Sequence, residues 1–295
     1  MKRVLVTGSN GLLGKQVVDA LLRENFEVTG IATGDTSECR DPRFNYISAD
    51  LTNWLKVDAI FKENEFSHVI HLAGIAHVLK GMNISWSRYY RVNTMMSRKI
   101  FECASAEKTP IFFASTVDVY GFTDDIINES TKPKPIGDYA RSKYLAEQSI
   151  LELPDQPYLI ARFAPIYSEE DRHDMRRRYY LRFPELCYLI GDGMDYEFLS
   201  SKNAAALIVK WVKSWETISG IVNVCDEKRH NTKALIQADR ENGWANMVLW
   251  MPRWIKGLAR VSVDMAFYKK PLLKFSAYKI ICPMQIDRSR LNSLL

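Results

Sequence analysis

The chain has 295 residues, of which 47% are hydrophobic and 25% are charged, with 40 basic and 35 acidic side chains. This composition is typical of a soluble globular protein, and the absence of any run of 18 apolar residues excludes a membrane span. The net charge of +5 fits a phosphorylated ligand or an acidic surface, but we favour a solvated charged face and expect no nucleic-acid partner. Five scattered cysteines without metal spacing, and an apolar strand pattern in place of a secretory leader, predict a cytoplasmic protein.

Short apolar runs alternate with amphipathic helical patterns over the first two-thirds of the chain. We expect strands at Val4–Thr7, Val28–Ala32, Asn45–Ser48, His68–Leu72, Ile111–Ser115 and Leu159–Arg162. We expect helices at Gly14–Glu24, Trp54–Asn64, Trp86–Glu107 and Asp138–Leu151. This alternation predicts an α/β fold, a Rossmann-type doubly wound parallel sheet whose ligand site lies at the carboxyl ends of the strands.

The pattern becomes irregular after residue 171. The remaining chain predicts strands and helices at Cys187–Ile190, Lys202–Trp215, Ile221–Val224, Thr232–Asn242 and Trp254–Tyr268. We therefore expect a dinucleotide-binding Rossmann domain over residues 1–171 and a smaller C-terminal α/β substrate lobe over residues 172–295. Strands of the sheet can interleave between the two parts.

A glycine-rich segment follows the first expected strand and opens the first helix. Glycines at these positions allow a tight turn and let backbone N–H groups approach a pyrophosphate at the positive end of the helix. At this N-terminal location the spacing TGxxGxxG predicts dinucleotide binding. The residues expected to contact the cofactor here are Gly8, Asn10, Gly11, Leu12 and Gly14.

The end of the second strand should decide between NAD and NADP. An acidic residue there would bind the adenosine ribose, but the position falls at Ala32 or Thr33. Asp35 lies slightly later, and Arg40 and Arg43 follow on an expected loop. The expected cofactor is therefore NAD(P), with NADP slightly favoured. Asp50 and Leu51, after the third strand, are expected at the adenine edge, although a plain helix N-cap is an equal alternative for Asp50.

Lys143 follows Tyr139 by four positions within an expected helix. Residues at this spacing lie on the same face, so the Lys143 ammonium can favour the ionised form of the Tyr139 hydroxyl and lower its pKa from about 10. Such pairs also arise by chance. This pair indicates a catalytic site because it follows the glycine-rich segment and the fifth expected strand in the chain.

Six segments, in this order, together resemble the short-chain dehydrogenase/reductase superfamily. They resemble most its extended branch of nucleotide-sugar epimerases, dehydratases and reductases, and they cover about the first 170 residues. The segments are Thr7–Gly14, His71–Gly74, Asn93, Ser115–Gly121, Pro135–Lys143 and Arg162–Tyr167.

The resemblance implies a role for each matching residue. Tyr139 would be the acid/base residue, Lys143 would hold the nicotinamide ribose, and Thr116 would bind the reacting oxygen. Ser115, beside Thr116, is a second candidate for substrate contact. Further cofactor contacts are expected at Leu72, Ala73, Gly74 and Asn93.

The sequence departs from the branch at two places. Dehydratases carry an Asp-Glu pair after the catalytic Thr, and here the pair is Val117-Asp118, which disfavours water elimination. Tyr196 stands where these enzymes place an arginine for the substrate diphosphate. Arg176, Arg177 and Arg178 are the candidates to supply that charge, against the alternative of a solvated basic turn.

These observations predict an NAD(P)-dependent oxidoreductase or epimerase acting at C4 of a nucleotide-linked sugar, as a 4-epimerase or a 4-ketoreductase in polysaccharide biosynthesis. One alternative is a reductase of a carbonyl compound without a nucleotide. Another is a non-catalytic cofactor-binding scaffold on the same fold, which the intact Thr116, Tyr139 and Lys143 set disfavours.

Three further expectations concern structure and partners. His71 is expected to be a packed histidine rather than a catalyst, and no metal site is expected because the histidines lack ligand spacing. The resemblance implies a homodimer through the helices Trp86–Glu107 and Tyr139–Glu152. The basic, aromatic-rich segment Trp250–Ile281 suits peripheral membrane contact, but we favour its packing onto the substrate lobe.

Overall fold

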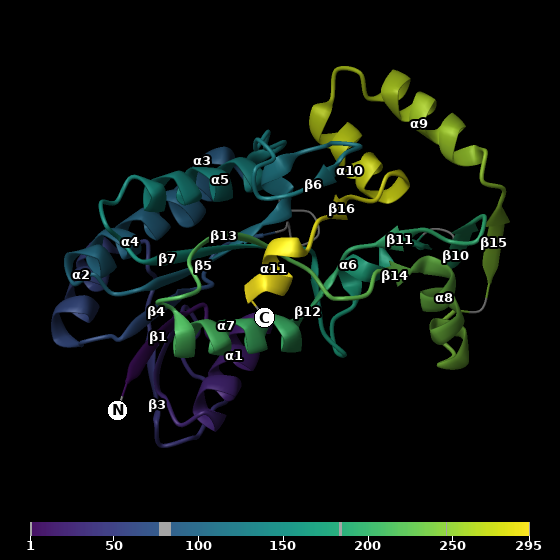
Figure 1. Cartoon of the computed structure of the whole chain (residues 1–295). Coiled ribbons are helices and arrows are strands. Elements are labelled where there is room, and N and C mark those ends of the chain that lie inside the picture. The colour runs from purple at the N-terminus through teal and green to yellow at the C-terminus, as the bar shows by residue number, and fades with distance from the viewer. Residues whose placement is uncertain (1, 77–83, 183–184, 246, 295) are drawn as a thin grey trace.

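A seven-stranded parallel sheet forms the centre of the molecule. The computed structural model describes residues 2–76, 84–182, 185–245 and 247–294 (Figure 1). The strand order is β13-β7-β5-β4-β1-β2-β3, with every neighbouring pair parallel. The strands are β1 (Arg3–Thr7), β2 (Glu27–Ala32), β3 (Phe44–Ser48), β4 (His68–His71), β5 (Ile111–Thr116), β7 (Tyr158–Phe163) and β13 (Gly220–Val224). The predicted Rossmann-type fold is therefore confirmed.

Helices cover both faces of this sheet (Figure 1). One face packs against α1 (Leu12–Arg23) and α7 (Ser201–Ser214). The other packs against α2 (Trp54–Glu63), α4 (Met96–Ala106) and α5 (Asp138–Leu151). Successive residues of β5 serve opposite cores, since Phe112 belongs to the first and Phe113 to the second. A strand buried on both faces needs an uninterrupted apolar sequence, which explains its apolar run.

The helix expected over residues 86–107 is divided into three parts. It comprises α3 (Trp86–Tyr89), a π-helical turn (Tyr90–Met95) and α4. Widened turns of this kind often occur at functional sites, and this one contains the buried Asn93.

A smaller group of elements lies at the carboxyl ends of the central strands. Its core contains the three-stranded sheet β15-β10-β9, where β10 pairs in parallel with β15 and antiparallel with β9. The elements are α6 (His173–Arg176), β9 (Tyr180–Arg182), β10 (Glu185–Ile190), α8 (Thr232–Glu241) and β15 (Val248–Met251). Three two-stranded pairings complete the strands: β12 (Leu199–Ser200) with β8 (Ile166–Tyr167), β11 (Asp195–Tyr196) with β14 (His230–Asn231), and β16 (Gln285–Ile286) with β6 (Ile126–Ile127). Because α7 and β13 return to the main layer after residue 171, the two parts interleave, and their division stays a prediction.

The C-terminal region ends in α9 (Ile255–Ala266), α10 (Pro271–Ile281) and the short α11 (Ser289–Leu294). The sequence pattern predicts α9 but neither α10 nor β15. In the described part of the chain, no helix combines the length and apolar character needed to cross a bilayer.

Candidate active site

The carboxyl ends of the central strands open onto a cavity of about 630 Å³. This volume lies within the range of small-molecule sites. The cavity extends from the glycine segment, past Thr116, Tyr139 and Lys143, to Arg177 and Arg178. Residues of α10 line its far side. The structure therefore brings the predicted catalytic residues and the glycine-rich segment Thr7–Gly14, which we call the glycine cradle, to one site.

The glycine cradle owes its shape to two close backbone approaches. Gly8 has a φ of 73°, and a Cβ there would lie 2.9 Å from the Ala73 nitrogen. A Cβ on Gly14 would lie 2.1 Å from the Gly8 carbonyl oxygen. Gly11 is the N-cap of α1 and contributes no side-chain cap, so the first N–H groups of this helix face the cavity region without a competing side chain. This arrangement fits the pyrophosphate of a dinucleotide.

The other expected cofactor residues separate into two groups. Leu12, Leu72, Gly74 and Asn93 line the cavity. Among the described residues, the lining does not include Asn10, Ala73, Asp50 or Leu51.

The helix α2, which follows β3, is capped by Asn53 and not by Asp50. Asn53 is the N-cap of α2, and its side chain accepts a hydrogen bond from the Lys56 N–H at 3.3 Å. Asp50 instead accepts from the Thr52 N–H at 2.9 Å. Hydrogen bonds from Thr52 lower the pKa of Asp50, and Leu51 is buried in the core. The N-cap alternative for Asp50 is thus wrong.

Asn93 joins the loop after β4 to the helix α5. Its side-chain oxygen accepts from the Ile75 N–H at 2.8 Å, and its amide donates to the Ile75 carbonyl at 2.9 Å. The same amide donates to the Ser142 hydroxyl at 3.0 Å, and that hydroxyl donates to the Tyr139 carbonyl at 2.8 Å. Asn93 thereby holds the start of α5, which carries Tyr139 and Lys143.

Thr116 and Tyr139 form the polar centre of the cavity. Thr116 ends β5, and its hydroxyl accepts from the Asp118 N–H at 3.2 Å. Burial raises the pKa of Tyr139 well above its ordinary value, and the Asp118 carboxylate raises it further. A hydrogen bond between the Thr116 and Tyr139 side chains acts in the opposite direction. The expectation of a lowered Tyr139 pKa is therefore wrong, because burial outweighs the polar contacts.

Lys143 is buried one helical turn after Tyr139. Its ammonium lies 4.1 Å from the centre of the Phe113 ring. Burial lowers the pKa of Lys143 to about 7, although the Glu147 carboxylate raises it. Lys143 therefore changes charge near neutral pH.

Replacing Lys143 should alter the pH dependence of stability. Because its pKa is about 7 in the folded protein and near the ordinary value of 10.5 when unfolded, the unfolded chain binds more protons between these values. The stability contributed by Lys143 thus rises with pH across this window. We expect the free energy of unfolding of the wild type to rise, relative to Lys143→Met, between about pH 7 and pH 10. Urea unfolding at both ends of the window measures this difference, and parallel pH profiles would contradict it.

A buried ion pair joins α5 to the strand β7. Glu147 accepts two hydrogen bonds from Arg162, at 3.0 and 2.6 Å, and both side chains are almost fully buried. Arg162 also donates to the Tyr120 hydroxyl at 2.8 Å, which in turn donates to Asn223 at 2.8 Å. Ser115 donates its hydroxyl to Glu147. Since this hydroxyl is already engaged, we leave Ser115 out of the proposed substrate contacts.

His71 packs beside this centre as the sequence predicts. Its ring nitrogens bond the Thr7 hydroxyl at 2.7 Å and the Ser97 hydroxyl at 2.8 Å. Burial, with Lys143 nearby, lowers the pKa of His71 well below its usual value. The histidine is consequently neutral and structural.

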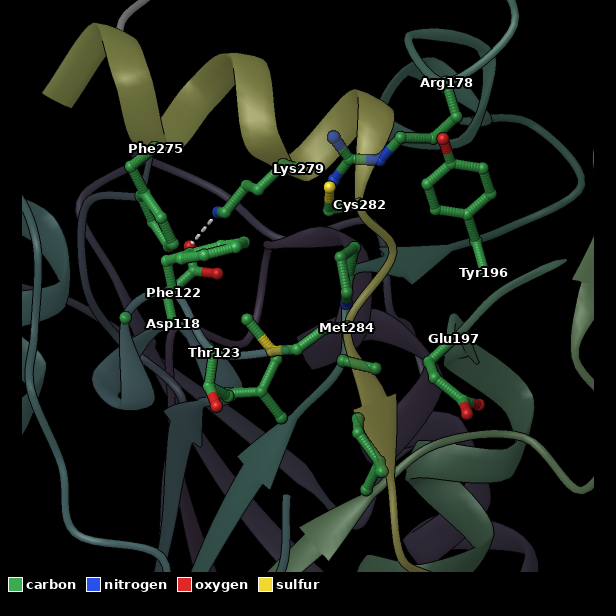
Figure 2. A pocket seen from close by; sticks show the side chains of 15 residues that line it. Asp118, Phe122, Thr123, Arg178, Tyr196, Glu197, Phe275, Lys279, Cys282 and Met284 are labelled. Carbon is green, nitrogen blue, oxygen red and sulfur yellow. Dashed lines mark hydrogen bonds and ion pairs between the residues drawn. The ribbon is translucent and has the colours of Figure 1, made fainter. Parts of the chain in front are cut away.

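An ion pair between Lys279 and Asp118 lies in the cavity and is not predicted by the sequence. Lys279 of α10 contacts Asp118, which follows Thr116 by two residues (Figure 2). The Tyr196 hydroxyl donates to the Ile280 carbonyl, again on α10. These contacts hold α10 against the site. They join residues more than 80 positions apart, so no local motif reveals them.

The three consecutive arginines have different surroundings. Arg176 turns toward Asp239 at 3.6 Å and, among the described residues, is not part of the cavity lining. Arg177 and Arg178 line the cavity. Arg178 lies over the Tyr196 ring at 5.8 Å, and its Nε has no hydrogen-bond partner among the described residues (Figure 2). The Arg178 guanidinium therefore lies beside Tyr196, which occupies the position where the resemblance leads us to expect an arginine.

A family model places these features in a known group. The model described as "NAD dependent epimerase/dehydratase family" matches residues 4–225. The chain belongs to this family. The matched range contains the glycine cradle, Thr116, Tyr139, Lys143 and the three arginines, whereas the α10 residues that line the cavity lie outside it.

Curated relatives within the family align with about half of this chain. UDP-arabinose 4-epimerase 1 of Arabidopsis thaliana is 30% identical over 175 residues, covering 54% of this chain and 42% of the relative. UDP-glucose 4-epimerase of Streptococcus mutans is 31% identical over 170 residues, covering 55% of this chain and 50% of the relative. Each match therefore spans at most half of the relative's own length.

Solved structures of nucleotide-sugar 4-epimerases share the fold over nearly the whole chain. UDP-glucuronic acid 4-epimerase from Bacillus cereus, in complex with NAD, superposes with a TM-score of 0.74 at 20% identity, covering 99% of this chain and 92% of that one. The UDP-Glc/GlcNAc 4-epimerase from Campylobacter jejuni gives a TM-score of 0.75 at 18% identity, covering 100% and 93%. At these identities the likeness establishes the fold alone.

Proposed function

We propose that this member of the epimerase/dehydratase family acts at C4 of a nucleotide-linked sugar, using Thr116, Tyr139 and Lys143. The main support is the continuity of one cavity, which joins the glycine cradle to the Thr116–Tyr139 pair and then to Arg178. Along this cavity the glycine cradle would bind the dinucleotide, the Thr116–Tyr139 pair would contact the reacting sugar carbon's oxygen, and Arg178 would bind the diphosphate. Curated relatives named as nucleotide-sugar 4-epimerases support the same assignment.

The chain's own residues would supply the proton transfer. A nicotinamide cofactor bound on Gly8, Gly11 and Gly14 would accept and return the hydride at C4. The raised pKa of Tyr139 keeps its phenol protonated at neutral pH, ready to donate to a keto oxygen. Removing a proton from a sugar hydroxyl requires positive charge nearby, and Lys143 provides it below its pKa of about 7. Thr116 orients the oxygen that exchanges its proton with Tyr139.

Two outcomes of this chemistry remain open to test. A 4-epimerase retains its cofactor through the reaction, whereas a 4-ketoreductase consumes a reduced one. Purified protein that carries stoichiometric NAD and changes the configuration at C4 would support the epimerase. Protein purified without cofactor that oxidises NADPH with a 4-keto sugar would support the reductase. Failure of both reactions with UDP- and dTDP-linked sugars would contradict the proposed function.

The preference for NADP rests on the residues around the end of β2. Positions 32 and 33 hold Ala and Thr and not an acidic residue, which leaves room for a 2′-phosphate. Arg43, however, is engaged by Asp41 at 2.6 and 2.9 Å, so Arg40 is the basic residue left exposed. The slight preference for NADP is therefore carried by Arg40, and titration with NADH and NADPH tests it.

Arg178 is the residue proposed to bind the substrate diphosphate. Hydrogen bonds to charged groups contribute about 1.5–3 kcal/mol, so we expect Arg178→Ala to raise KM for a nucleotide sugar by about 10- to 100-fold. The matched control is Arg176→Ala, which removes the same side chain two residues earlier, outside the described lining of the cavity. Steady-state kinetics of both variants measure the difference. Equal KM values for Arg178→Ala and the wild type would remove Arg178 from the site.

A further inference from the structure

The apolar stripe along α9 is largely exposed in the described structure. Trp254, Leu258, Val261, Met265 and Tyr268 are between 56% and 79% exposed. Their alternating spacing of four and three residues places Leu258, Val261 and Met265 on one face of the helix, with Trp254 at its N-cap and Tyr268 just past its C-cap. Figure 1 shows α9 at the periphery, between β15 and α10 and away from the main sheet. Trp250, just before the helix, is also 62% exposed and extends the apolar surface.

Two charged residues of α9, Arg260 and Asp264, contact the protein instead. Arg260 donates two hydrogen bonds to Asp124, at 3.3 and 2.5 Å, and lies over the rings of Phe122 and Tyr278. Asp264 accepts from the Tyr278 hydroxyl at 2.6 Å and pairs with Lys274 at 2.6 Å. A surface helix of a water-soluble protein normally buries its apolar face and exposes its polar face. Here the stripe stays exposed, whereas Ile255 and Ile280 pack against the core of the smaller group of elements. The favoured packing onto the lobe therefore holds for part of the segment 250–281 but not for the stripe.

Basic charge is concentrated around this stripe. The segment 250–281 contains seven lysines and arginines and one acidic residue, Asp264. The remaining chain therefore contains 33 basic and 34 acidic residues, so the positive net charge comes from this segment. Lys269 and Lys270 are exposed, have no ion pair within the described residues, and lie at the C-terminal end of the stripe.

We infer that the α9 stripe, defined by Trp254, Leu258, Val261, Met265 and Tyr268, docks onto an anionic membrane surface. Apolar and aromatic side chains of an interfacial helix enter the boundary between headgroups and acyl chains, while neighbouring lysines contact anionic headgroups. A second copy of the chain fits less well, because a two-fold contact through α9 would bring the same lysines together. This inference does not depend on the proposed reaction.

Sedimentation with lipid vesicles tests the inference. We expect the full chain to pellet with vesicles of phosphatidylcholine and phosphatidylglycerol, and to remain in solution with phosphatidylcholine alone. The double variant Leu258→Asp/Met265→Asp should weaken binding at least about tenfold. Replacing Lys269 and Lys270 by Gln should weaken it about fivefold for each charge. The matched control is Leu55→Asp, which changes an equally apolar side chain, 81% exposed, on the distant helix α2.

Three outcomes would overturn the inference. The first is a wild-type protein that stays in solution with anionic vesicles, and the second is a stripe variant that binds them as tightly as the wild type. The third is a wild-type oligomer without lipid binding that the stripe variant converts to monomer in sedimentation velocity, which would make a second copy the occupant. Thermal unfolding of each variant checks that the chain remains folded.

Discussion

Tyr139→Phe is expected to lower kcat by about 10²- to 10⁴-fold, the usual contribution of a positioned general acid or base. The substitution removes the hydroxyl, which bonds Thr116, and retains the ring. Cofactor affinity should change little, because the glycine cradle and Lys143 remain. Turnover of a nucleotide sugar and titration with the cofactor measure the two effects separately.

Tyr144→Phe is the matched control for this prediction. It makes the same chemical change on the same helix, at a side chain packed against the core and outside the described lining of the cavity. Its activity should equal that of the wild type. A Tyr139→Phe enzyme with undiminished turnover would show that another group transfers the proton.

Loss of the buried carboxylate of Glu147 is expected to have the largest effect on stability. Glu147→Ala would leave the Arg162 guanidinium buried without its counter-charge, since these side chains are 0% and 3% exposed. Breaking such a pair typically costs about 3–5 kcal/mol of the free energy of unfolding. Urea unfolding monitored by circular dichroism measures this loss.

Two comparison variants test the physical reason for that loss. Glu102→Ala breaks the exposed pair between Arg98 and Glu102 on α4, which should cost less than about 0.5 kcal/mol. Glu147→Leu combined with Arg162→Met removes both buried charges and should recover part of the stability lost in Glu147→Ala. A double variant less stable than Glu147→Ala would show that the uncompensated charge is not the cause.

Local sequence patterns are sufficient to predict the central fold. The helix α5 has the bounds expected from its amphipathic pattern, Asp138–Leu151. Strands such as β5 are recognisable because burial on both faces requires a continuous apolar run. The glycine cradle is equally local, since its tight turn and its helix N-terminus lie within eight residues.

The rest of the site depends on contacts between distant segments. The ion pair of Asp118 with Lys279 and the contact of Arg178 with Tyr196 are set by how the C-terminal elements return to the sheet. The raised pKa of Tyr139 has a similar origin, because burial is a property of the assembled cavity. A helical spacing of four residues predicts that Tyr139 and Lys143 share a face, but it does not predict how little water reaches them.

The orientation of α9 also depends on tertiary structure. Its period predicts an amphipathic helix, and such a helix is normally expected to bury its apolar side. The contacts of Arg260 with Asp124 and of Asp264 with Lys274 fix the opposite orientation. The expected homodimer and the cytoplasmic location stay predictions.

Proton NMR of purified protein incubated with nucleotide sugars tests the central claim most directly. UDP- and dTDP-linked hexoses and their 4-keto derivatives are supplied with NAD, NADH or NADPH, and the configuration at C4 is followed with time. We predict that the wild type changes C4 of at least one of these sugars and that Tyr139→Phe does not. A wild-type protein that binds cofactor but leaves C4 unchanged in every sugar, or a Tyr139→Phe variant that changes C4 at the wild-type rate, would contradict the account.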